Sequence, residues 1–234
     1  MDGSIGACAR GRAWRPLVGH AAMALAAAVA SETRGADVEL SVARDGQRFE
    51  VQAQALMRTD LATAWATLTD YPSLPAFVPG IHRVHVVQRA PTAGGERLTV
   101  DYEGRFRLLF FVLPTRVRLD IRHAPPLDVR ASSLPLPAAG AQDRPPALKG
   151  FTGEYHLRAI APAADGAARV ALTHRSDFEL AQPLPPVVGP LFAGPALRHV
   201  LRRQLEAMAH ETERRAAAQA GGAPARHAGQ RAGS

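Results

Sequence analysis

The chain has 234 residues, of which 47% are hydrophobic, and this is enough for the core of one domain of ordinary size with appendages. Its formal net charge is +7, yet Lys149 is the only lysine and the remaining positive charge is spread over arginines. The chain has no run of five like charges, and no aromatic residues alternate with the arginines of residues 116–122, so the composition argues against a nucleic-acid partner.

The first 30 residues are typical of a secretory signal, with a positive start followed by a mostly apolar, alanine-rich run over residues 17–30. The residues that carry this pattern are Arg10, Arg12, Arg15, Ala28 and Ala30. We expect cleavage after Ala30 and a periplasmic or secreted protein, with an uncleaved anchor or a misassigned start as the alternatives. Cleavage would remove Cys8, the only cysteine, and would exclude disulfides, thiol catalysis and cysteine-based metal sites.

The folded part begins with a predicted hairpin. Apolar residues alternate over 38–42 and again over 49–55, and Asp45-Gly46 between them is typical of a two-residue turn.

A helix is predicted next, because Leu61, Ala64, Trp65 and Leu68 follow the i, i+3, i+4, i+7 spacing of one helix face. Thr59 or Asp60 can cap its start. The proline of Tyr71-Pro72 ends it, and a second short helical turn fits residues 73–78.

Most of the chain from residue 81 to residue 180 alternates as antiparallel strands do, and no βαβ pattern interrupts it. We predict strands over residues 81–88, 97–111, 117–121 and 128–134, followed by two more that carry Phe151 and Phe178. Pro114 is expected to separate the second of these strands from the third, and Gly104 to allow a bulge or a strong bend. Residues 135–147 are rich in proline and alanine and are predicted to form an inserted surface loop.

The stretch LTDYPSLPAFVPGI, preceded by Trp65 and followed by the strand-like IHRVHVV, resembles the entry to the START-like (SRPBCC) superfamily of polyketide cyclases and coenzyme Q-binding proteins. The resemblance covers residues 37–215. It implies an α+β helix-grip fold, in which a curved antiparallel sheet of about seven strands wraps a long C-terminal helix and leaves an apolar cavity.

The final helix is expected to begin at Gly194 and Pro195, after a proline-rich crossing over residues 183–195. Its apolar stripe consists of Leu197, Val200, Leu201, Leu205 and Met208. Residues 216–234 have little to bury and are predicted to form a disordered tail.

Motifs that carry enzymatic chemistry are mostly absent from the sequence, which has no phosphate-binding loop, nucleophile elbow or zincin motif. His82 and His85 are three apart on a strand and should face opposite sides, so we expect no metal and no cofactor. Asp101 and Glu103 share the predicted solvent face with Arg105, which indicates surface ion pairs rather than an acid–base pair.

The polar residues that alternation turns inward are more informative, because a polar atom beneath a sheet needs a structural partner or faces a ligand. These residues are Tyr102, Tyr155, His174 and Ser176. Each could be an ordinary core residue; together they could orient an apolar ligand. The predicted ligand-binding set is Phe77, Tyr102, Phe106, Phe110, Leu119, Phe151, Tyr155, His174, Leu197, Leu201 and Leu205.

The resemblance implies non-catalytic binding or transport of a hydrophobic small molecule such as a lipid, a quinone or a polyketide-like compound, with transient membrane contact and an open oligomeric state. The alternative is a cyclase or dehydratase acting on an aromatic or polyketide-like substrate, with His174 as general base and a tyrosine polarising a carbonyl. A third possibility is RNA contact, as in superfamily members that associate with ribosomes, and a cleaved export signal would exclude it.

Overall fold

The structure is a computed structural model that describes residues 37–108, 111–136, 148–181 and 188–222. All of them belong to one compact unit. The predicted signal segment, most of the predicted inserted loop and the chain beyond residue 222 lie outside the described residues.

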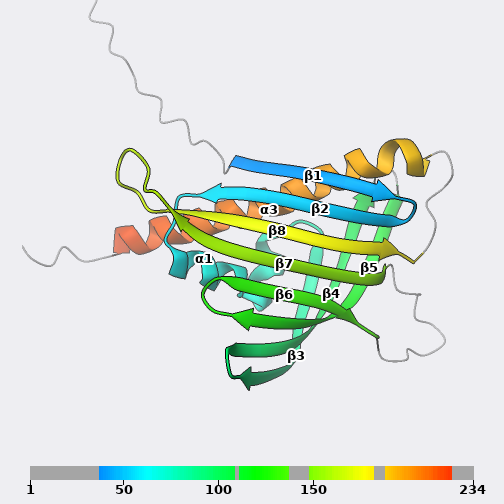
Figure 1. Cartoon of the computed structure of the whole chain (residues 1–234), viewed down its shortest axis with the longest axis horizontal. Helices are drawn as coiled ribbons and strands as arrows, with labels where there is room; N and C mark the ends of the chain where they lie inside the picture. Colours follow the sequence, from blue (N-terminus) through cyan, green and yellow to red (C-terminus); the bar gives the residue numbers. More distant parts are fainter. Residues whose placement is uncertain (1–36, 109–110, 137–147, 182–187, 223–234) are drawn as a thin grey trace, which may run out of the picture. The chain divides into compact units, whose positions relative to one another are not determined.

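Eight antiparallel strands form a single sheet in the order β1-β2-β8-β7-β6-β5-β4-β3 (Figure 1). Every pair of neighbours except β2 and β8 is also consecutive in sequence, so short turns connect most of the sheet. The strands are β1 (Asp37–Asp45), β2 (Arg48–Met57), β3 (Ile81–Thr92), β4 (Gly95–Leu108), β5 (Phe111–Ala124), β6 (Asp128–Leu134), β7 (Leu148–Ile160) and β8 (Arg169–Leu180). The predicted α+β helix-grip architecture is confirmed, and the described residues contain eight strands, within the expected seven or eight.

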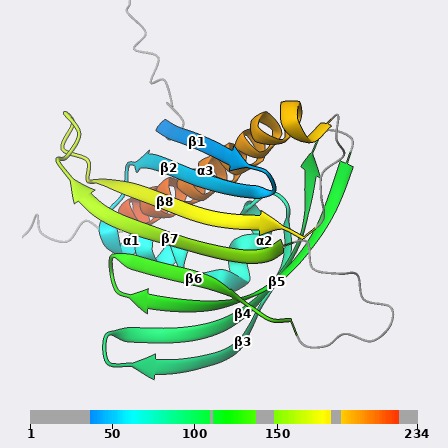
Figure 2. The ribbon, with the colours of Figure 1, turned by 45° about the vertical axis from the view of Figure 1, so that its right-hand side comes forward.

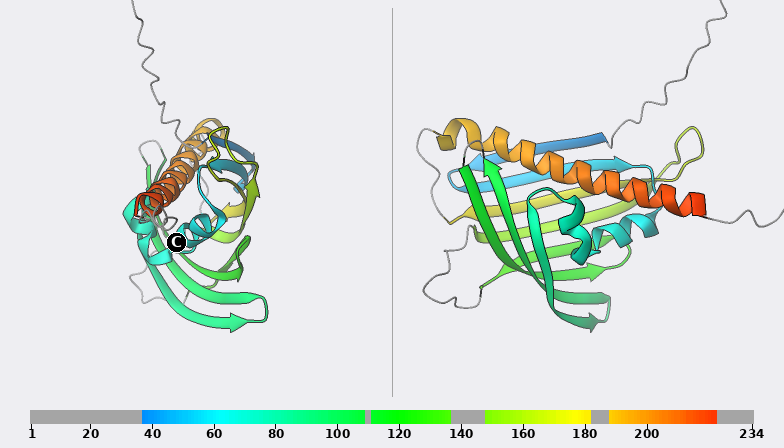
Figure 3. Two further views of the ribbon diagram at one scale, coloured as in Figure 1. Left: turned by 90° about the vertical axis from the view of Figure 1, so that its left-hand side faces the viewer. Right: turned by 180° about the vertical axis from the view of Figure 1, so that it is seen from behind.

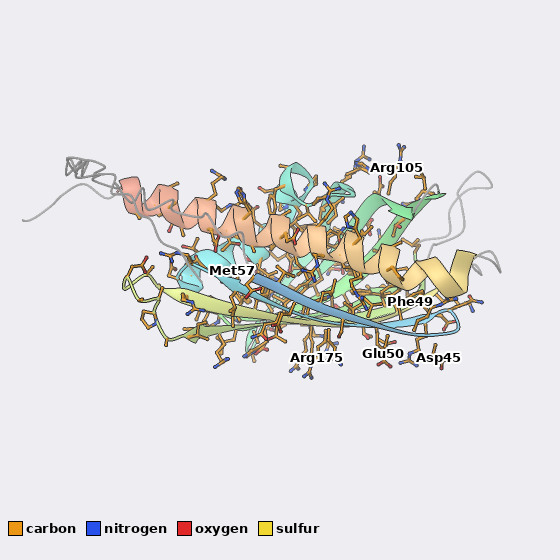
Figure 4. All side chains as sticks on the ribbon, turned by 90° about the horizontal axis from the view of Figure 1, so that it is seen from above. Asp45, Phe49, Glu50, Met57, Arg105 and Arg175 are labelled. Atoms are coloured by element: carbon orange, nitrogen blue, oxygen red, sulfur yellow. The ribbon has the colours of Figure 1, made fainter. Side chains whose placement is uncertain are left out.

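The sheet curls so that one face, which we call the inner face, is directed toward the C-terminal helix α3 (Val188–Gly222) (Figure 2). Alternate side chains divide between the two faces as the sequence predicted. Phe49 and Met57 of β2 lie on the side of α3, whereas Glu50 and the neighbouring Arg175 point away from it (Figure 4).

Two turns differ from the predictions. The first loop is Gly46-Gln47 rather than Asp45-Gly46, because Asp45 still pairs with Arg48, and Gly46 adopts a φ of 58° that favours glycine. The predicted strand 97–111 ends at Leu108, and Phe111 already begins β5.

Pro114 does not separate two strands but lies within β5, opposite Arg105 of β4. Among the described residues, β6 pairs with residues 118–124 of β5 and no strand pairs with that side of β5 at Pro114. A proline, which has no N–H to donate, is tolerated at such an edge. Beside Gly104, for which a bulge or a strong bend was predicted, the register of β3 against β4 shifts between Ile81 and Arg83. The position itself needs glycine, since a Cβ atom there would lie 2.4 Å from the carbonyl oxygen of Gly80.

Three short helical elements link β2 to β3: α1 (Leu61–Leu68), a 3₁₀ turn η1 (Tyr71–Ser73) and α2 (Leu74–Phe77). Asp60 caps α1, because its Oδ1 accepts the Thr63 N–H at 2.9 Å. The second helical stretch begins at Tyr71 rather than Ser73, since Pro72 fits the first turn of a 3₁₀ helix.

Helix α3 is longer than predicted, starting at Val188 and running to Gly222 past the expected boundary at Arg215. Pro195 lies inside it and removes one hydrogen bond, but most of a helix's stability in a protein comes from tertiary packing. Its C-terminal turns have such partners, because Glu213 accepts the backbone N–H of Arg58 at 2.8 Å and Gln219 meets the Thr63 hydroxyl at 3.0 Å.

Helix α3 rests on both margins of the curled sheet, and its principal contacts are with β1 and β2 on one side and with β4, α1 and α2 on the other (Figure 3). The Arg202 guanidinium donates to the carbonyl of Val38 at 2.8 Å, and the Gln204 amide donates to the carbonyl of Pro79 at the same distance. Helix α1 fills one end of the curl by packing on β7, β8 and α3.

Packing on the inner face therefore changes along the strands. We call the end beneath α1 the closed half; its inner-face residues are exposed by 2% or less and are Leu98, Val100, Ile121, Leu157, Val170 and Leu172. Toward the end where α3 begins, inner-face residues of β4 to β8 keep part of their surface exposed. These residues, which we call the open half, are Tyr102, Val117, Ala131, Ser133, Phe151, Tyr155, Ser176 and Phe178.

The closed half contains a polar pair, Tyr71 and His123, whose residues are 3% and 6% exposed. The Tyr71 oxygen lies 2.6 Å from Nε2 of His123, and Glu96 lies 3.4 Å from Nδ1. Because an ionised carboxylate only accepts, Nδ1 carries the proton and the tyrosine O–H donates to Nε2. Trp65 packs edge-on against the same imidazole at 5.4 Å.

Arg215 provides the first prediction from this packing. It bonds Glu211 at 2.7 Å and Asp70 at 3.0 Å, and its guanidinium lies 5.7 Å from the centre of the Phe77 ring. Replacing it with alanine should lower the free energy of unfolding by about 1 kcal/mol, because α3 loses its tie to η1 and α2. Urea unfolding measures the change. Arg214→Ala is the matched control. Within the described residues Arg214 bonds Glu211 alone, so its replacement should lower the free energy of unfolding much less. Equal losses in the two variants would contradict the role assigned to Arg215.

His123 provides a pH-dependent prediction. Burial lowers its pKa from the ordinary 6.5, although Glu96 opposes the shift, and Arg89 adds to it. Below pH 6.5 the unfolded chain therefore binds a proton that the folded chain does not bind. The free energy of unfolding has its full value above pH 6.5 and falls as the pH drops through the folded pKa. Unfolding of wild type and His123→Phe between pH 7 and pH 5 measures the slope, which should be shallower in the variant. Tyr71→Phe keeps the imidazole, so it should lose stability yet retain the slope; a flat wild-type profile would refute the prediction.

Candidate functional site

The candidate site is the open half of the inner face together with the first turns of α3 above it. The polar residues predicted to point inward do so: Tyr155 of β7 lies opposite His174 of β8, and Gly153 lies opposite Ser176. The Phe151 ring lies over Gly153, because a Cβ atom there would come within 2.8 Å of that ring. Strand pairing thus gathers these groups at the centre of the sheet.

Tyr155 and His174 form a stacked pair, with ring centres 4.2 Å apart and an angle of 23° between the planes. Nδ1 of His174 lies 3.2 Å from the carbonyl oxygen of Glu154, and a carbonyl can only accept, so Nδ1 carries the proton. Burial lowers the pKa of His174 to about 4, and the hydrogen bond to Glu154 opposes this shift only in part. The imidazole is therefore neutral at pH 7 and presents the lone pair of Nε2.

The chain has three tyrosines, and the inner face brings all of them near one another. Tyr71 and Tyr102 meet edge to face at 6.5 Å. Burial raises the pKa of both hydroxyls, with smaller contributions from Tyr155 to Tyr71 and from Tyr71 and Tyr155 to Tyr102. Burial raises the pKa of Tyr155 to about 12. All three hydroxyls stay protonated at neutral pH, so they can donate or accept a hydrogen bond without carrying charge.

The polar tips of the open half have no partners within the described part of the chain. Neither the hydroxyl of Tyr102, the hydroxyl of Tyr155 nor Nε2 of His174 makes a hydrogen bond there, in contrast to the Tyr71 hydroxyl. Among the described residues, Oε1 of Gln47 is the fully buried side-chain oxygen or nitrogen that lacks a partner, and none of the three tips is buried in this way. The three tips are thus not sealed in the core and remain open to solvent or a ligand.

The predicted apolar wall divides into two groups. Phe77, Leu119, Phe151 and Leu205 belong to the main core cluster, in which Leu119 and Leu205 are buried and the two phenylalanines half-buried. Leu197 belongs to a second cluster, around the stacked pair Phe49 and Phe178 under the start of α3.

Three further predicted residues stand apart from these two groups. Leu201 is half-buried on α3, one turn after Leu197. Phe110 and the side chain of Phe106 lie outside the described part of the structure.

Sequence reasoning missed Tyr71 and His123 as members of the interior polar set. His123 continues the inward series Val117, Leu119 and Ile121 by two, so alternation alone could have found it. Tyr71 had no such signal, because it follows a helix end and its orientation depends on the 3₁₀ turn at Pro72.

The outer face carries a shallow depression of about 400 Å³ across β2, β8, β7 and β6, above the position of Gly153. Its charged side chains are Glu50, Arg130, Glu154, Arg175 and Asp177. A surface rich in exposed charges of both signs offers little apolar area to bury, so this depression does not suit the hydrophobic ligand class. The expected surface ion pairs are confirmed beside it: Arg118 holds Asp101 with bonds of 2.6 and 2.7 Å.

Metal ligation finds no support in the described residues, where no three histidine, cysteine or acidic side chains come together. Helix α3 is long but rich in charge, and within the described ranges no helix has the length and apolar character of a membrane span.

Comparisons with known proteins agree with this architecture. Residues 57–209 match the family model described as polyketide cyclase / dehydrase and lipid transport. No curated protein matches the chain.

Among solved structures, a STAR-related lipid transfer protein from Xanthomonas axonopodis is 14% identical, with a TM-score of 0.51, over 78% of this chain and 96% of its own. The di-domain ARO/CYC protein StfQ from the steffimycin biosynthetic pathway is 16% identical, with a TM-score of 0.50, over 75% of this chain. Only 52% of StfQ is covered, so this chain spans about half of that protein.

At such identities the structural likeness establishes the fold alone. The family match is broader evidence, because it extends from the end of β2 into the second half of α3. The resemblance to START-like proteins noted from the stretch around Tyr71 is thereby confirmed. The chain belongs to the polyketide cyclase/dehydrase and lipid transport family.

Proposed function

We propose that the protein binds or carries a hydrophobic small molecule between the open half of the sheet and α3. The observation that carries this proposal is the incomplete burial of the inner face at Tyr102, Phe151 and Tyr155, beside a closed half that is fully packed. Inner-face aromatic side chains with exposed surface gain free energy when an apolar ligand covers them, roughly 25 cal/mol per Å².

The placement of α3 supports the same conclusion. The helix spans from β1 and β2 to β4, and its principal contacts do not include β5, β6 or β7. Helix α1 covers β7 and β8 only at the closed end. In the open half, β5, β6 and β7 therefore have no helix among their principal contacts within the described residues, whereas Phe178 of β8 meets Leu197 of α3. The inner side chains of β5, β6 and β7 are thus left for a ligand.

The chemistry of the interior also suits binding. The open half offers aromatic and aliphatic surface with a few uncharged polar tips, which is the usual composition of small-molecule sites. These tips can fix the orientation of a ligand while the apolar surface supplies most of the affinity.

A cyclase or dehydratase is the second candidate, and one observation favours it. The tautomer of His174 is fixed by the Glu154 carbonyl and its Nε2 lone pair is free, which is how a general base is held. However, burial brings the pKa of His174 to about 4, and a general base is most effective when its pKa lies near the working pH. The histidine is better suited to accepting a hydrogen bond than to removing a proton.

A space-filling variant tests the binding proposal. Ala131→Phe places a ring into the open half, whereas Arg130→Phe places the same ring on the outer face of the same strand. If about 60 Å² of apolar contact is lost, Ala131→Phe should weaken binding of the dye N-phenylnaphthylamine about tenfold, and Arg130→Phe should leave it unchanged.

Fluorescence titration measures both affinities, and thermal unfolding verifies that each variant is folded. Lipophiles that copurify with the wild type, identified by mass spectrometry after solvent extraction, would support the proposal further. Equal dye binding by the two variants, or no binding by the wild type, would refute it.

A second prediction separates carrier from enzyme. A linear poly-β-ketone thioester is incubated with the wild type and with His174→Ala, and the products are analysed by mass spectrometry. For a carrier we expect cyclisation no faster than in buffer with either protein. If the wild type accelerates cyclisation and His174→Ala does not, the enzymatic alternative replaces the carrier.

A further inference from the structure

The hydrogen-bonding state of His174 specifies the ligand more narrowly than apolar character does. His174 is 6% exposed, its Nδ1 donates to the carbonyl of Glu154 at 3.2 Å, and its ring stacks on Tyr155. These contacts fix both the plane of the imidazole and its tautomer. Nε2 is consequently an acceptor, because a tautomer with the proton on Nε2 would lose the hydrogen bond to Glu154.

Nε2 meets no hydrogen-bond partner among the described residues, although His123 in the closed half has a partner on each ring nitrogen. An acceptor that an apolar ligand covers without pairing costs about 1–3 kcal/mol. A ligand with a hydroxyl at this position avoids that cost, because its O–H can donate to Nε2. The depressed pKa of His174 keeps this acceptor unprotonated throughout the neutral range.

The open half also discriminates against charged ligands. Its eight residues and His174 carry no carboxylate, guanidinium or ammonium group. On α3 above the sheet, Arg198 and Arg203 are exposed and Arg202 is bound to the carbonyl of Val38. Among the described strand residues that face inward, the charged ones lie at the two ends of the inner face. Glu96 is bound to His123 and Arg89 in the closed half, and Arg44 lies at the rim over the Phe49 ring at 5.6 Å. A carboxylate or phosphate at the centre would lose its hydration without gaining a counter-ion.

We propose that the site selects uncharged lipophiles that carry a hydroxyl group, a long-chain phenol or alcohol, and that Nε2 of His174 accepts the hydroxyl proton. This inference rests on the proposed binding function and names the ligand class for it. Tyr155 lies against the same imidazole, and its hydroxyl is available as a second partner for the ligand oxygen.

Three matched probes test the selection: para-nonylphenol, its methyl ether para-nonylanisole, and para-nonylbenzoate. They share the alkyl chain and ring and differ in having a donor, no donor, or a negative charge. Competition against N-phenylnaphthylamine gives the affinities. The wild type should bind the phenol three- to tenfold more tightly than the ether, as expected for one hydrogen bond, and should bind the benzoate most weakly.

The variant His174→Phe keeps a ring to stack on Tyr155 but removes the acceptor. It should bind the phenol no more tightly than the ether, while its affinity for the ether stays within twofold of wild type. Thr173→Val changes the neighbouring side chain on the opposite face and should retain the wild-type preference for the phenol.

Each outcome decides a separate statement. If the wild type binds phenol and ether equally, or if His174→Phe keeps the preference, the hydroxyl selection is wrong and the binding function stands. If the benzoate binds most tightly, the exclusion of charge is wrong. If the wild type binds none of the probes and does not bind the dye, the binding function fails as well.

Discussion

The structure depends on how one long helix rests on a curled sheet. Helix α3 touches the β1–β2 margin and the β4 margin, and Arg202, Gln204 and Arg215 tie it to Val38, Pro79 and Asp70. A helix held at both margins cannot also pack closely along β5, β6 and β7. Whether the interior is solid then depends on what else enters it, and α1 enters only at one end.

This constraint explains why one sheet carries two kinds of inner face. In the closed half, α1 brings Ala64 and Leu68 to the strands, and large side chains such as Leu157 and Leu172 are almost wholly buried. In the open half the strands contribute the small side chains of Ala131, Ser133 and Ser176, and the Phe151 ring covers Gly153. The fold is stabilised by the first half, so the second can remain partly exposed without loss of the fold.

Much of this arrangement could be read from the sequence, because period-two alternation specifies which side chains share a face. It placed Tyr102, Tyr155, His174 and Ser176 inward, and the turn residues located most of the hairpins. Alternation failed where a local backbone feature, such as a turn or a proline within a strand, determines the path of the chain. Residues 97–111 alternate as one strand, and Pro114 was expected to separate that strand from the next. Within the described residues Pro114 pairs with β4 on one side and has no strand paired on the other, which is why it can lie inside β5.

The ends of α3 were missed for a related reason. Prolines near position 190 disfavour a helix, and the residues after Arg215, although mostly alanines that form helices well, offer little apolar surface to bury. At the C-terminal end, contacts from Glu213 to Arg58 and from Gln219 to Thr63 hold the helix to the rest of the domain. Such contacts join segments about 155 residues apart, and neither a local pattern nor the family resemblance predicts them. The same holds for Tyr71, whose orientation follows from a tertiary fit.

The two buried histidines show how the same residue type takes different roles in the two halves. Both have a pKa lowered by burial, so both are neutral at pH 7. His123 has Tyr71 on one nitrogen and Glu96 on the other, which satisfies its hydrogen bonds within the core. His174 has Glu154 on one nitrogen and no protein partner on the other within the described residues. Nε2 of His174 is not among the fully buried atoms without a partner in the described residues, so solvent can reach it in the free protein. The penalty arises only when a ligand displaces that solvent, because a covered acceptor then needs a new donor. A hydroxyl on the ligand is the simplest group that supplies one.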